Sequence, residues 1–498
     1  MKITIGKKLI FLISAVVILS VCINLISGCD NKQPGSVNEP NIAANRPASE
    51  TGETEEPESG PAHYVADYLP DVSYGGYEFR IVSTSSGLFA DYPEFWADTT
   101  EETGETVNDA IYKRNRLIEE RYDIVFKEIS VNDWPELQPL FKKSVTAGSD
   151  DFDLCMLISR EAWATALTGA IFPLKDLPYL DMSQPWYAHD VNSQISINGK
   201  YYFAYSDECL NMFGQTLCVL FNKKITEELA LDNMYNLVKE NKWTTDKFYE
   251  FAKAAAKDLD GDGKMTKDDR YGIHSRNDMF FPYFWVGSGL KTVGKDENDL
   301  LVFIGDNQRL YDILEKTYQN IWGGETVYLE DATGDLFENN LALFRVNDIC
   351  SIARYRGMEM DFGILPFPKN DESQEKYYTR VIDGWINCVP GYAPNTERTS
   401  IIMEALAVEA KNYTVPAYYE VALRAKHARD DESLEMLDII HATRTVDLGD
   451  TFYYEPVRST FSSVIDAKKN TFASSVEKNT ARIQKALDKA NEAALLLD

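Results

Sequence analysis

The sequence alternates short apolar segments with longer segments that have helical spacing. Residues 77–84 (YEFRIVST) carry apolar side chains at every second position, which is the period of a half-buried β-strand. Further strand candidates are residues 151–158, 200–206, 216–222, 360–368 and 384–391. Between the first two, one side of a predicted helix carries Val107, Ile111, Leu117, Ile118 and Tyr122. This alternation predicts an α/β fold with mainly parallel sheets, in two or three domains, and the chain from about residue 466 onward is predicted to be helical.

The first residues have the pattern of a secretion signal. Three lysines precede an apolar run over residues 9–26, and Ser27 and Gly28 stand before Cys29. An uncleaved membrane helix is the alternative for a run of this length. The sequence ISGC resembles the lipobox of bacterial lipoproteins, with isoleucine where leucine is commoner. The resemblance implies a signal peptide over residues 1–28, acyl chains such as palmitate on Cys29, and a position on the outer face of the cytoplasmic membrane.

The next segment is too polar to fold. The stretch from Asn31 to His63 is rich in Pro, Gly, Ser, Asn and Glu and nearly free of large apolar residues. Such a composition cannot bury enough surface to offset the entropy of ordering the chain. We therefore expect a disordered tether over residues 29–72, which leaves the lipid anchor as the only membrane contact.

The charge of the chain excludes several partners. The chain has 50 basic and 79 acidic residues, a net charge of −29, which is the wrong sign for binding nucleic acid or an anionic membrane surface. Cysteines beyond residue 29 are odd in number and lack C-x-x-C spacing, which favours buried thiols over a disulfide framework. The five histidines form no H-E-x-x-H motif, and no G-x-S-x-G motif is present.

Four stretches, in order along the chain, resemble the extracellular solute-binding proteins of bacterial ABC importers, the group that includes maltose- and alginate-binding proteins. They are residues 151–177 (DFDLCMLISREAWATALTGAIFPLKDL), 197–225, 241–273, and 337–348 with the segments 361–369 and 384–395 that follow it. The resemblance of each stretch is unspecific alone, but together the four stretches cover most of the chain from Tyr77 to Thr396.

The resemblance implies two α/β lobes joined by crossing strands, with a ligand cleft between them. The first lobe is expected over residues 73–204 with a return segment at about 383–440. The second is expected over residues 205–382 with C-terminal helices at about 441–498. Such a protein captures an extracellular solute, here expected to be an oligosaccharide, and delivers it to a permease. It would be a monomer without enzymatic activity.

Sugars are held by aromatic planes and by planar polar side chains. Side chains of these types are the candidate ligand contacts where they follow predicted strands or crossings, or where the resemblance to maltose-binding proteins implies a sugar contact. They are Ser85, Trp96, Ser159, Arg160, Glu161, Asp207, Glu208, Gln215, Phe281, Tyr283, Trp285 and Trp385. Alternatives remain open for several of them. The aromatic residues could pack in the core, and Arg160 could pair with Glu161 on the surface. Arg345 and Asp348 are expected to form a structural ion pair, and Trp243 to lie in the core.

The stretch DLDGDGKMTKDD (Asp258–Asp269) has the spacing of a calcium loop. The carboxylates Asp258, Asp260, Asp262 and Asp269 fall at its first, third, fifth and twelfth positions. A glycine stands at the sixth position, the Lys264 carbonyl at the seventh and Thr266 at the ninth. The alternative is an acidic turn stabilised by Asx bonds. A single loop that leads from a helix into a strand predicts structural Ca²⁺ rather than a sensor.

Three other functions stay open at this point. A secreted glycoside hydrolase would need two carboxylates across a cleft, and the acids are too numerous to exclude such a pair. A surface carbohydrate-binding protein without a transporter is the second. The third is a binding protein whose solute is not a sugar.

Overall fold

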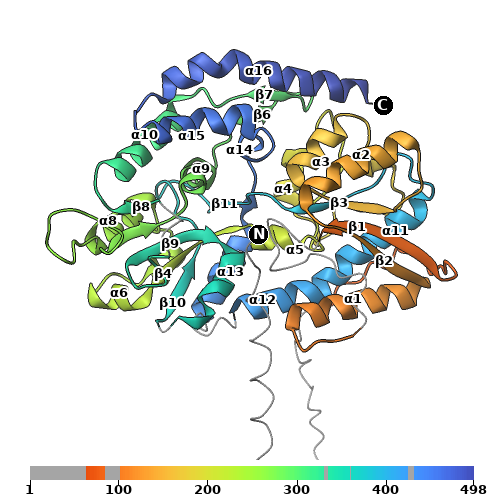
Figure 1. The fold of residues 1–498 in the computed structure, drawn as a ribbon, viewed down its shortest axis with the longest axis horizontal. Coiled ribbons are helices and arrows are strands. Elements are labelled where there is room, and N and C mark those ends of the chain that lie inside the picture. Colours follow the sequence, from red (N-terminus) through yellow and green to blue (C-terminus); the bar gives the residue numbers. More distant parts are fainter. Residues whose placement is uncertain (1–62, 85–100, 330–334, 359, 424–430, 498) are drawn as a thin grey trace, which may run out of the picture. The chain divides into compact units, whose positions relative to one another are not determined.

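The computed structural model describes residues 63–84, 101–329, 335–358, 360–423 and 431–497 (Figure 1). The predicted signal peptide, Cys29, most of the tether, Ser85 and Trp96 lie outside the described residues. Residues 63–72 were expected in the tether, but Ala66 and Leu69 are buried in the hydrophobic core, so this stretch belongs to the folded body. In the part of the chain that the structure describes, no helix is both long and apolar enough to cross a membrane.

The first lobe contains a four-stranded sheet in the order β12-β3-β1-β2. Its strands are β1 (Tyr77–Thr84), β2 (Ile124–Val131), β3 (Leu154–Ile158) and β12 (Trp385–Cys388). β1 runs parallel to β2 and β3, and β12 is antiparallel to β3. Figure 1 shows α2 (Leu137–Ala147) and α3 (Ser159–Ala166) above this sheet and α1 (Thr106–Tyr122) below it, near α11 (Thr396–Glu409).

The second lobe contains a five-stranded sheet in the order β10-β4-β9-β5-β8. The strands are β4 (Leu217–Asn222), β5 (Tyr271–His274), β8 (Val327–Tyr328), β9 (Ala342–Asp348) and β10 (Phe362–Leu365). β5 is parallel to β8 and β9, whereas β4 is antiparallel to β9 and β10. The sheet is therefore mixed, because β4 enters it from the opposite direction after the crossing. Its helices are α6 (Lys223–Glu228), α7 (Met234–Lys239), α8 (Thr245–Ala255), α9 (Asn277–Gly287), α10 (Gln308–Trp322) and α13 (Asp431–Ala442).

Within the described residues, the chain crosses between the lobes at three places. It crosses first near α5 (Leu210–Gly214), after α4 (His189–Ile195), and returns through β11 (Thr379–Arg380) to β12. It crosses again along α11, a π-helical turn at Ala410–Thr414, and α12 (Val415–Leu423), which contacts both α1 and the 3₁₀ helix Ile349–Gly357. α13 packs on β10, so the return segment of the first lobe ends before it rather than near residue 440. β13 (Arg444–Thr445) then pairs with β11.

The C-terminal elements pack against the second lobe. They are α14 (Leu448–Thr451), α15 (Ser459–Asp466) and α16 (Phe472–Leu496), which lie with α9, α10 and the hairpin β6 (Val293–Lys295) and β7 (Leu301–Phe303). The predicted C-terminal helix is confirmed, with Ile483, Leu487 and Ala490 on its buried side.

Local sequence explains where several helices begin. Side-chain oxygens of Asn307 and Asn395 accept the N–H of Leu310 and Arg398, both at 2.9 Å, and so cap α10 and α11. The α1 prediction is confirmed with one exception. Leu117 was expected on the buried side, but it is 38% exposed because the inner face of α1 turns toward α11 and α12 instead.

One predicted strand is absent. Residues 200–206 are a short apolar and aromatic run, but they form only isolated bridges. Their backbone groups bond to neighbouring turns, because the Tyr201 carbonyl accepts the N–H of Leu174 at 2.8 Å and Tyr205 exchanges bonds with the Asn192 side chain. Tyr202, Phe203 and Tyr205 are nevertheless buried, so the apolar run reflects core burial without a sheet.

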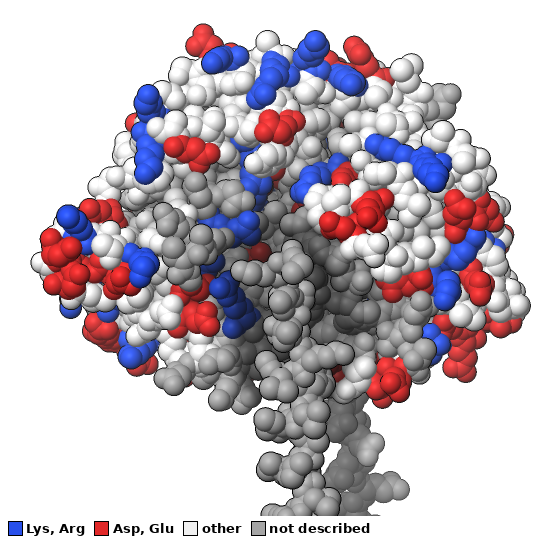
Figure 2. Space-filling model, viewed as in Figure 1, with Lys and Arg blue, Asp and Glu red and all other residues white. Residues whose placement is uncertain are grey.

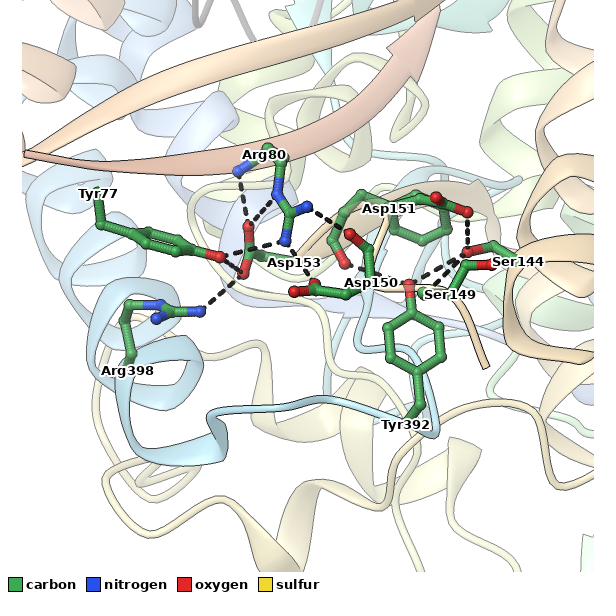
Figure 3. Close-up of polar contacts among 10 residues, drawn as sticks. Tyr77, Arg80, Ser144, Ser149, Asp150, Asp151, Asp153, Tyr392 and Arg398 are labelled. Atoms are coloured by element: carbon green, nitrogen blue, oxygen red, sulfur yellow. Dashed lines mark hydrogen bonds and ion pairs between the residues drawn. The ribbon is translucent and has the colours of Figure 1, made fainter. Parts of the chain in front are cut away.

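A buried carboxylate joins β1, β3 and α11 at the edge where β1 and β3 begin (Figure 3). Asp153 is 2% exposed and accepts the backbone N–H and the Nε–H of Arg80 at 2.8 and 3.1 Å. Its second oxygen accepts from the Tyr77 hydroxyl at 2.9 Å and from Arg398 at 3.1 Å. Asp150, which also pairs with Arg80, is exposed. The network fixes the first-lobe sheet at the edge opposite the candidate site.

Candidate functional site

The candidate site lies where parallel strands of both sheets end, which is where open α/β sheets place their ligands. In the first lobe, Trp134 follows β2, and Ser159 and Arg160 follow β3. In the second lobe, Arg276 follows β5 and Asp348 ends β9. Gln215 stands at the same edge, because the antiparallel β4 begins there with Leu217 opposite Asp348.

A three-residue segment joins these two edges. The Ile382 N–H donates to the Gln215 carbonyl at 3.1 Å, on the second-lobe edge. Two residues later, the Gly384 carbonyl accepts the Ser159 N–H at 2.9 Å, on the first-lobe edge. Asp383 is therefore held between the two sheets. We call the polar side chains at these two edges and at the crossings the interlobe site: Ser159, Arg160, Asp207, Glu208, Gln215, Asp348, Asp383, Asn387 and Lys411.

Asp383 connects two of the predicted contacts. Its carboxylate is 3% exposed, accepts a hydrogen bond from the Ser159 hydroxyl, and forms an ion pair with Arg160 Nη1 at 2.7 Å. Burial raises the pKa of Asp383, and the Arg160 guanidinium opposes that rise. Arg160 thus pairs with Asp383 rather than with Glu161, and its side chain remains 41% exposed. Glu161 is half-buried, and burial raises its pKa.

Two acids at the first crossing are more deeply placed than expected. Asp207 pairs with Lys411 in the π-helical turn at 2.9 Å, and burial raises its pKa. Glu208 accepts a hydrogen bond from the Asn387 amide in β12, and burial raises its pKa as well. Both side chains are under 5% exposed, at 3% and 4%. These residues therefore shape the wall of the site and hold the crossing, and they offer a solute little surface.

The second-lobe edge contributes an amide, a thiol and a carboxylate. Gln215 is buried, and its Nε2 lies 3.5 Å from Cys350 Sγ. The Cys350 thiol donates to Asp348 at 3.1 Å, while burial raises the pKa of the Asp348 carboxyl. The expected pairing of Asp348 with Arg345 is not the one that forms, because Arg345 pairs with Asp335 at 3.3 Å.

The aromatic residues predicted for the second lobe belong to its core. Phe281 stacks on Phe472 of α16 with ring centres 5.4 Å apart, and Trp285 donates its indole N–H to Asp447 at 3.0 Å. Tyr283 is 1% exposed and lies 5.2 Å from the Arg380 guanidinium. Trp385 is buried within β12, opposite Ile158. Their burial corrects the prediction that these side chains face a solute. Trp243 is buried as expected.

Sequence reasoning missed Asp383, Asn387, Lys411 and Trp134. The sequence DGW before the predicted strand at 384 could have pointed to Asp383, because it is a polar turn at a strand end. Lys411 lies in a helix far along the chain, and no local pattern connects it with Asp207. Trp134 follows directly after β2 within the turn DWPE, which is a detectable signal.

The acidic loop lies between α8 and β5, at the left edge of the view where acidic side chains gather (Figures 1 and 2). Single carboxylate oxygens of Asp258, Asp260 and Asp262 approach within 4.8 Å of one another. The two oxygens of Asp269 accept the backbone N–H of Leu259 at 2.8 Å and of Thr266 at 2.7 Å. These bonds lower the pKa of Asp269. The two oxygens of Asp258 likewise accept the backbone N–H of Gly261 at 2.7 Å and of Gly263 at 2.8 Å. The loop leads into a strand as predicted, at Tyr271.

The sequence matches no protein-family model and no curated protein. Solved structures do match the fold. UgpB from Mycobacterium tuberculosis, in complex with glycerophosphocholine, gives a TM-score of 0.54 at 16% identity over 83% of this chain and 100% of that one. A cyclo/maltodextrin-binding protein with maltotetraose gives 0.53 at 14% identity over 85% and 96%. An ABC substrate-binding protein from Listeria monocytogenes with cycloalternan gives 0.53 at 11% over 83% and 99%.

This chain has the two-lobed fold of ABC solute-binding proteins. In a solute-binding-protein fold, the space between the lobes is the expected place for a ligand, since pockets form preferentially between domains. The interlobe site around Asp383 lies there.

Proposed function

We propose that the protein is a lipid-anchored solute-binding protein, which captures an extracellular oligosaccharide between its lobes and delivers it to the permease of an ABC importer. The observation that carries this proposal is the position of Asp383 between the ends of both sheets, in a fold built for closing on a solute. Hinge closure around the ligand would present a changed lobe surface to the permease.

The charges at the interlobe site favour a neutral solute. Arg160 is paired with Asp383, and Lys411 is paired with Asp207. A solute with its own charge would have to compete with these internal pairs, whereas hydroxyl groups can add hydrogen bonds to them. Planar carboxylate, guanidinium and amide groups are the polar partners that a sugar requires. The saccharides bound by two of the similar structures agree with this choice.

A screen separates this proposal from its alternatives. Purified protein would be tested by thermal shift against neutral oligosaccharides, peptides and glycerophosphodiesters, and by chromatography for cleaved sugar. A rise in Tm with a neutral oligosaccharide that stays intact supports solute binding. Release of shorter sugars would indicate a glycoside hydrolase. A response to a glycerophosphodiester or peptide alone would replace the substrate class.

We also propose that Cys29 carries the lipid anchor. Several acyl chains hold a protein durably on a membrane, whereas one alone is marginal. In a Cys29→Ala variant, the mature chain should move from the membrane fraction to the soluble fraction or stay as an unprocessed precursor. Equal membrane retention with full processing would refute the assignment.

Finally, we propose that the acidic loop holds Ca²⁺ as a structural ion. Asp258, Asp260 and Asp262 would supply carboxylate oxygens, Lys264 its carbonyl, and Thr266 its hydroxyl, with Asp269 closing the loop. Hard oxygen donors in this number fit Ca²⁺. Bound there, the ion would neutralise the clustered carboxylates.

A further inference from the structure

A sugar-binding site needs an apolar surface for the ring faces, and the structure removes the predicted candidates for that role. Phe281, Tyr283, Trp285 and Trp385 are all at most 6% exposed. Trp96 lies outside the described residues. Among the described residues, an aromatic surface for the solute must therefore come from another side chain.

Trp134 lies at the edge of the first-lobe sheet where its parallel strands end. It begins a 3₁₀ turn (Trp134–Glu136) three residues after β2 ends, on the edge that also carries Ser159 and Arg160. Its side chain is half-buried, so part of the indole remains accessible. Among the residues that the structure describes, it is the tryptophan that combines this edge with partial exposure.

Neighbouring groups hold the indole in place. Asp133 accepts the backbone N–H of Trp134 at 2.9 Å and Pro135 follows, which fixes the backbone of the turn. The Arg160 guanidinium carbon lies 5.5 Å from the centre of the ring, within the range of a cation–π contact. Arg160 is itself held by Asp383. Gln138, in the helix that follows the turn, bonds to the Glu161 carbonyl at 3.1 Å and to the Thr165 hydroxyl at 2.9 Å. Trp134 therefore contacts Arg160, which in turn pairs with Asp383, so the three side chains connect the edge of the first-lobe sheet with the crossing segment.

We propose that Trp134 is the aromatic surface on which one sugar ring of the solute stacks, with Arg160 beside it donating hydrogen bonds to the ring hydroxyls. This inference rests on the proposed function and specifies it: the solute must present an apolar C–H face next to hydroxyl groups. An indole held in advance loses little freedom on binding, which favours affinity. The indole supplies a large apolar surface with a single polar group, the N–H.

The chain offers a matched control. Trp322, at the end of α10, is 36% exposed and has the Lys468 ammonium 4.3 Å from its ring. It shares partial exposure and a cation contact with Trp134, but it lies away from the strand ends. Affinities for a neutral trisaccharide would be measured by calorimetry for wild type, Trp134→Ala, Trp134→Phe and Trp322→Ala.

We expect Trp134→Ala to weaken binding about tenfold or more and Trp134→Phe about threefold, with Trp322→Ala unchanged. A second measurement does not depend on folding of the variants. In wild type labelled with fluorotryptophan, the Trp134 resonance should shift on saturation while that of Trp322 stays. If wild type binds the trisaccharide and neither the affinity of Trp134→Ala nor the Trp134 resonance changes, the assignment is overturned. If wild type binds no saccharide in the panel, the proposed function falls with it.

Discussion

Arg160 and Asp383 lie 223 positions apart in the chain, yet their side chains form an ion pair of 2.7 Å. Arg160 follows β3 of the first lobe, and Asp383 belongs to the segment that returns from the second lobe. The pair thus connects the end of β3 in the first lobe with the segment that crosses between the lobes. Movement of one lobe relative to the other should change the geometry of this ion pair, because the segment 382–384 is hydrogen-bonded to the edges of both sheets.

Replacing Asp383 should impair solute binding more than folding. In Asp383→Asn, the shape is kept, but Arg160 loses its charged partner and its fixed direction. We expect the affinity for the solute to fall at least about tenfold, since charge-assisted bonds of this kind contribute more than neutral ones. Lys247→Gln, which removes a surface pair with Glu250 on α8, is the control and should bind normally. Wild-type affinity of Asp383→Asn by calorimetry would contradict the role given to Asp383.

The carboxylate network at the opposite edge should govern stability. Asp153→Ala leaves Arg398 and Tyr77 without their buried acceptor, so the free energy of unfolding should fall by about 3–5 kcal/mol. Asp150→Ala removes an exposed partner of the same Arg80 and should cost less than about 1 kcal/mol. Urea unfolding of both variants measures the difference. Similar losses for the two would show that burial of Asp153 is not what matters.

His441 should make the fold sensitive to mild acid. Its ring stacks on Phe213 at 4.8 Å and its Nε2 faces Arg444 at 2.8 Å. Burial, together with the charges of Arg444 and Lys411, lowers the pKa of His441 to about 2. The unfolded chain binds a proton near pH 6.5 while the folded chain does not, so stability is present above that pH and lost below it.

The expected loss is about 1 kcal/mol between pH 6.5 and 5.5. Urea unfolding of wild type and of His441→Gln at the two pH values tests this. In His441→Gln, the free energy of unfolding should depend less on pH, by the part that His441 contributes. An identical pH slope in both proteins would mean that His441 has the same pKa in the folded as in the unfolded chain.

Calcium should raise the melting temperature without changing the affinity for the solute. The loop joins α8 to β5, away from the interlobe site, so an ion there would hold a corner of the second lobe. Chelation should lower Tm in wild type and have no effect in a variant carrying Asp260→Asn and Asp262→Asn. The same Tm with and without chelator in wild type would leave the loop as an acidic turn.

Periodicity predicted elements well where one face of an element is buried by the element beside it. β1 and α16 are examples, because the repeat of buried residues matches the geometry of each. The core aromatic residues of α9 could not be assigned this way. Their partners Phe472 and Asp447 come from C-terminal elements more than 150 residues later, and an apolar helix next to a cleft looks the same in sequence as one in a core.

The residues of the candidate site also differ in whether local sequence or distant segments determine their role. Ser159 and Arg160 were predictable because a polar turn directly follows a buried strand. Asp383 and Lys411 were missed because their importance depends on which distant segments the fold brings to them. Asp207 and Glu208 were found as polar residues at a crossing, but only the structure reveals that both point into the interior.

Calorimetric titration of the wild-type protein with neutral oligosaccharides, with the sugar recovered and analysed afterwards, shows whether the protein binds such a solute without cleaving it. We expect saturable binding of one molecule per chain, with the sugar recovered intact. Absence of binding to every neutral oligosaccharide in the panel, or recovery of shortened sugar, would contradict this expectation.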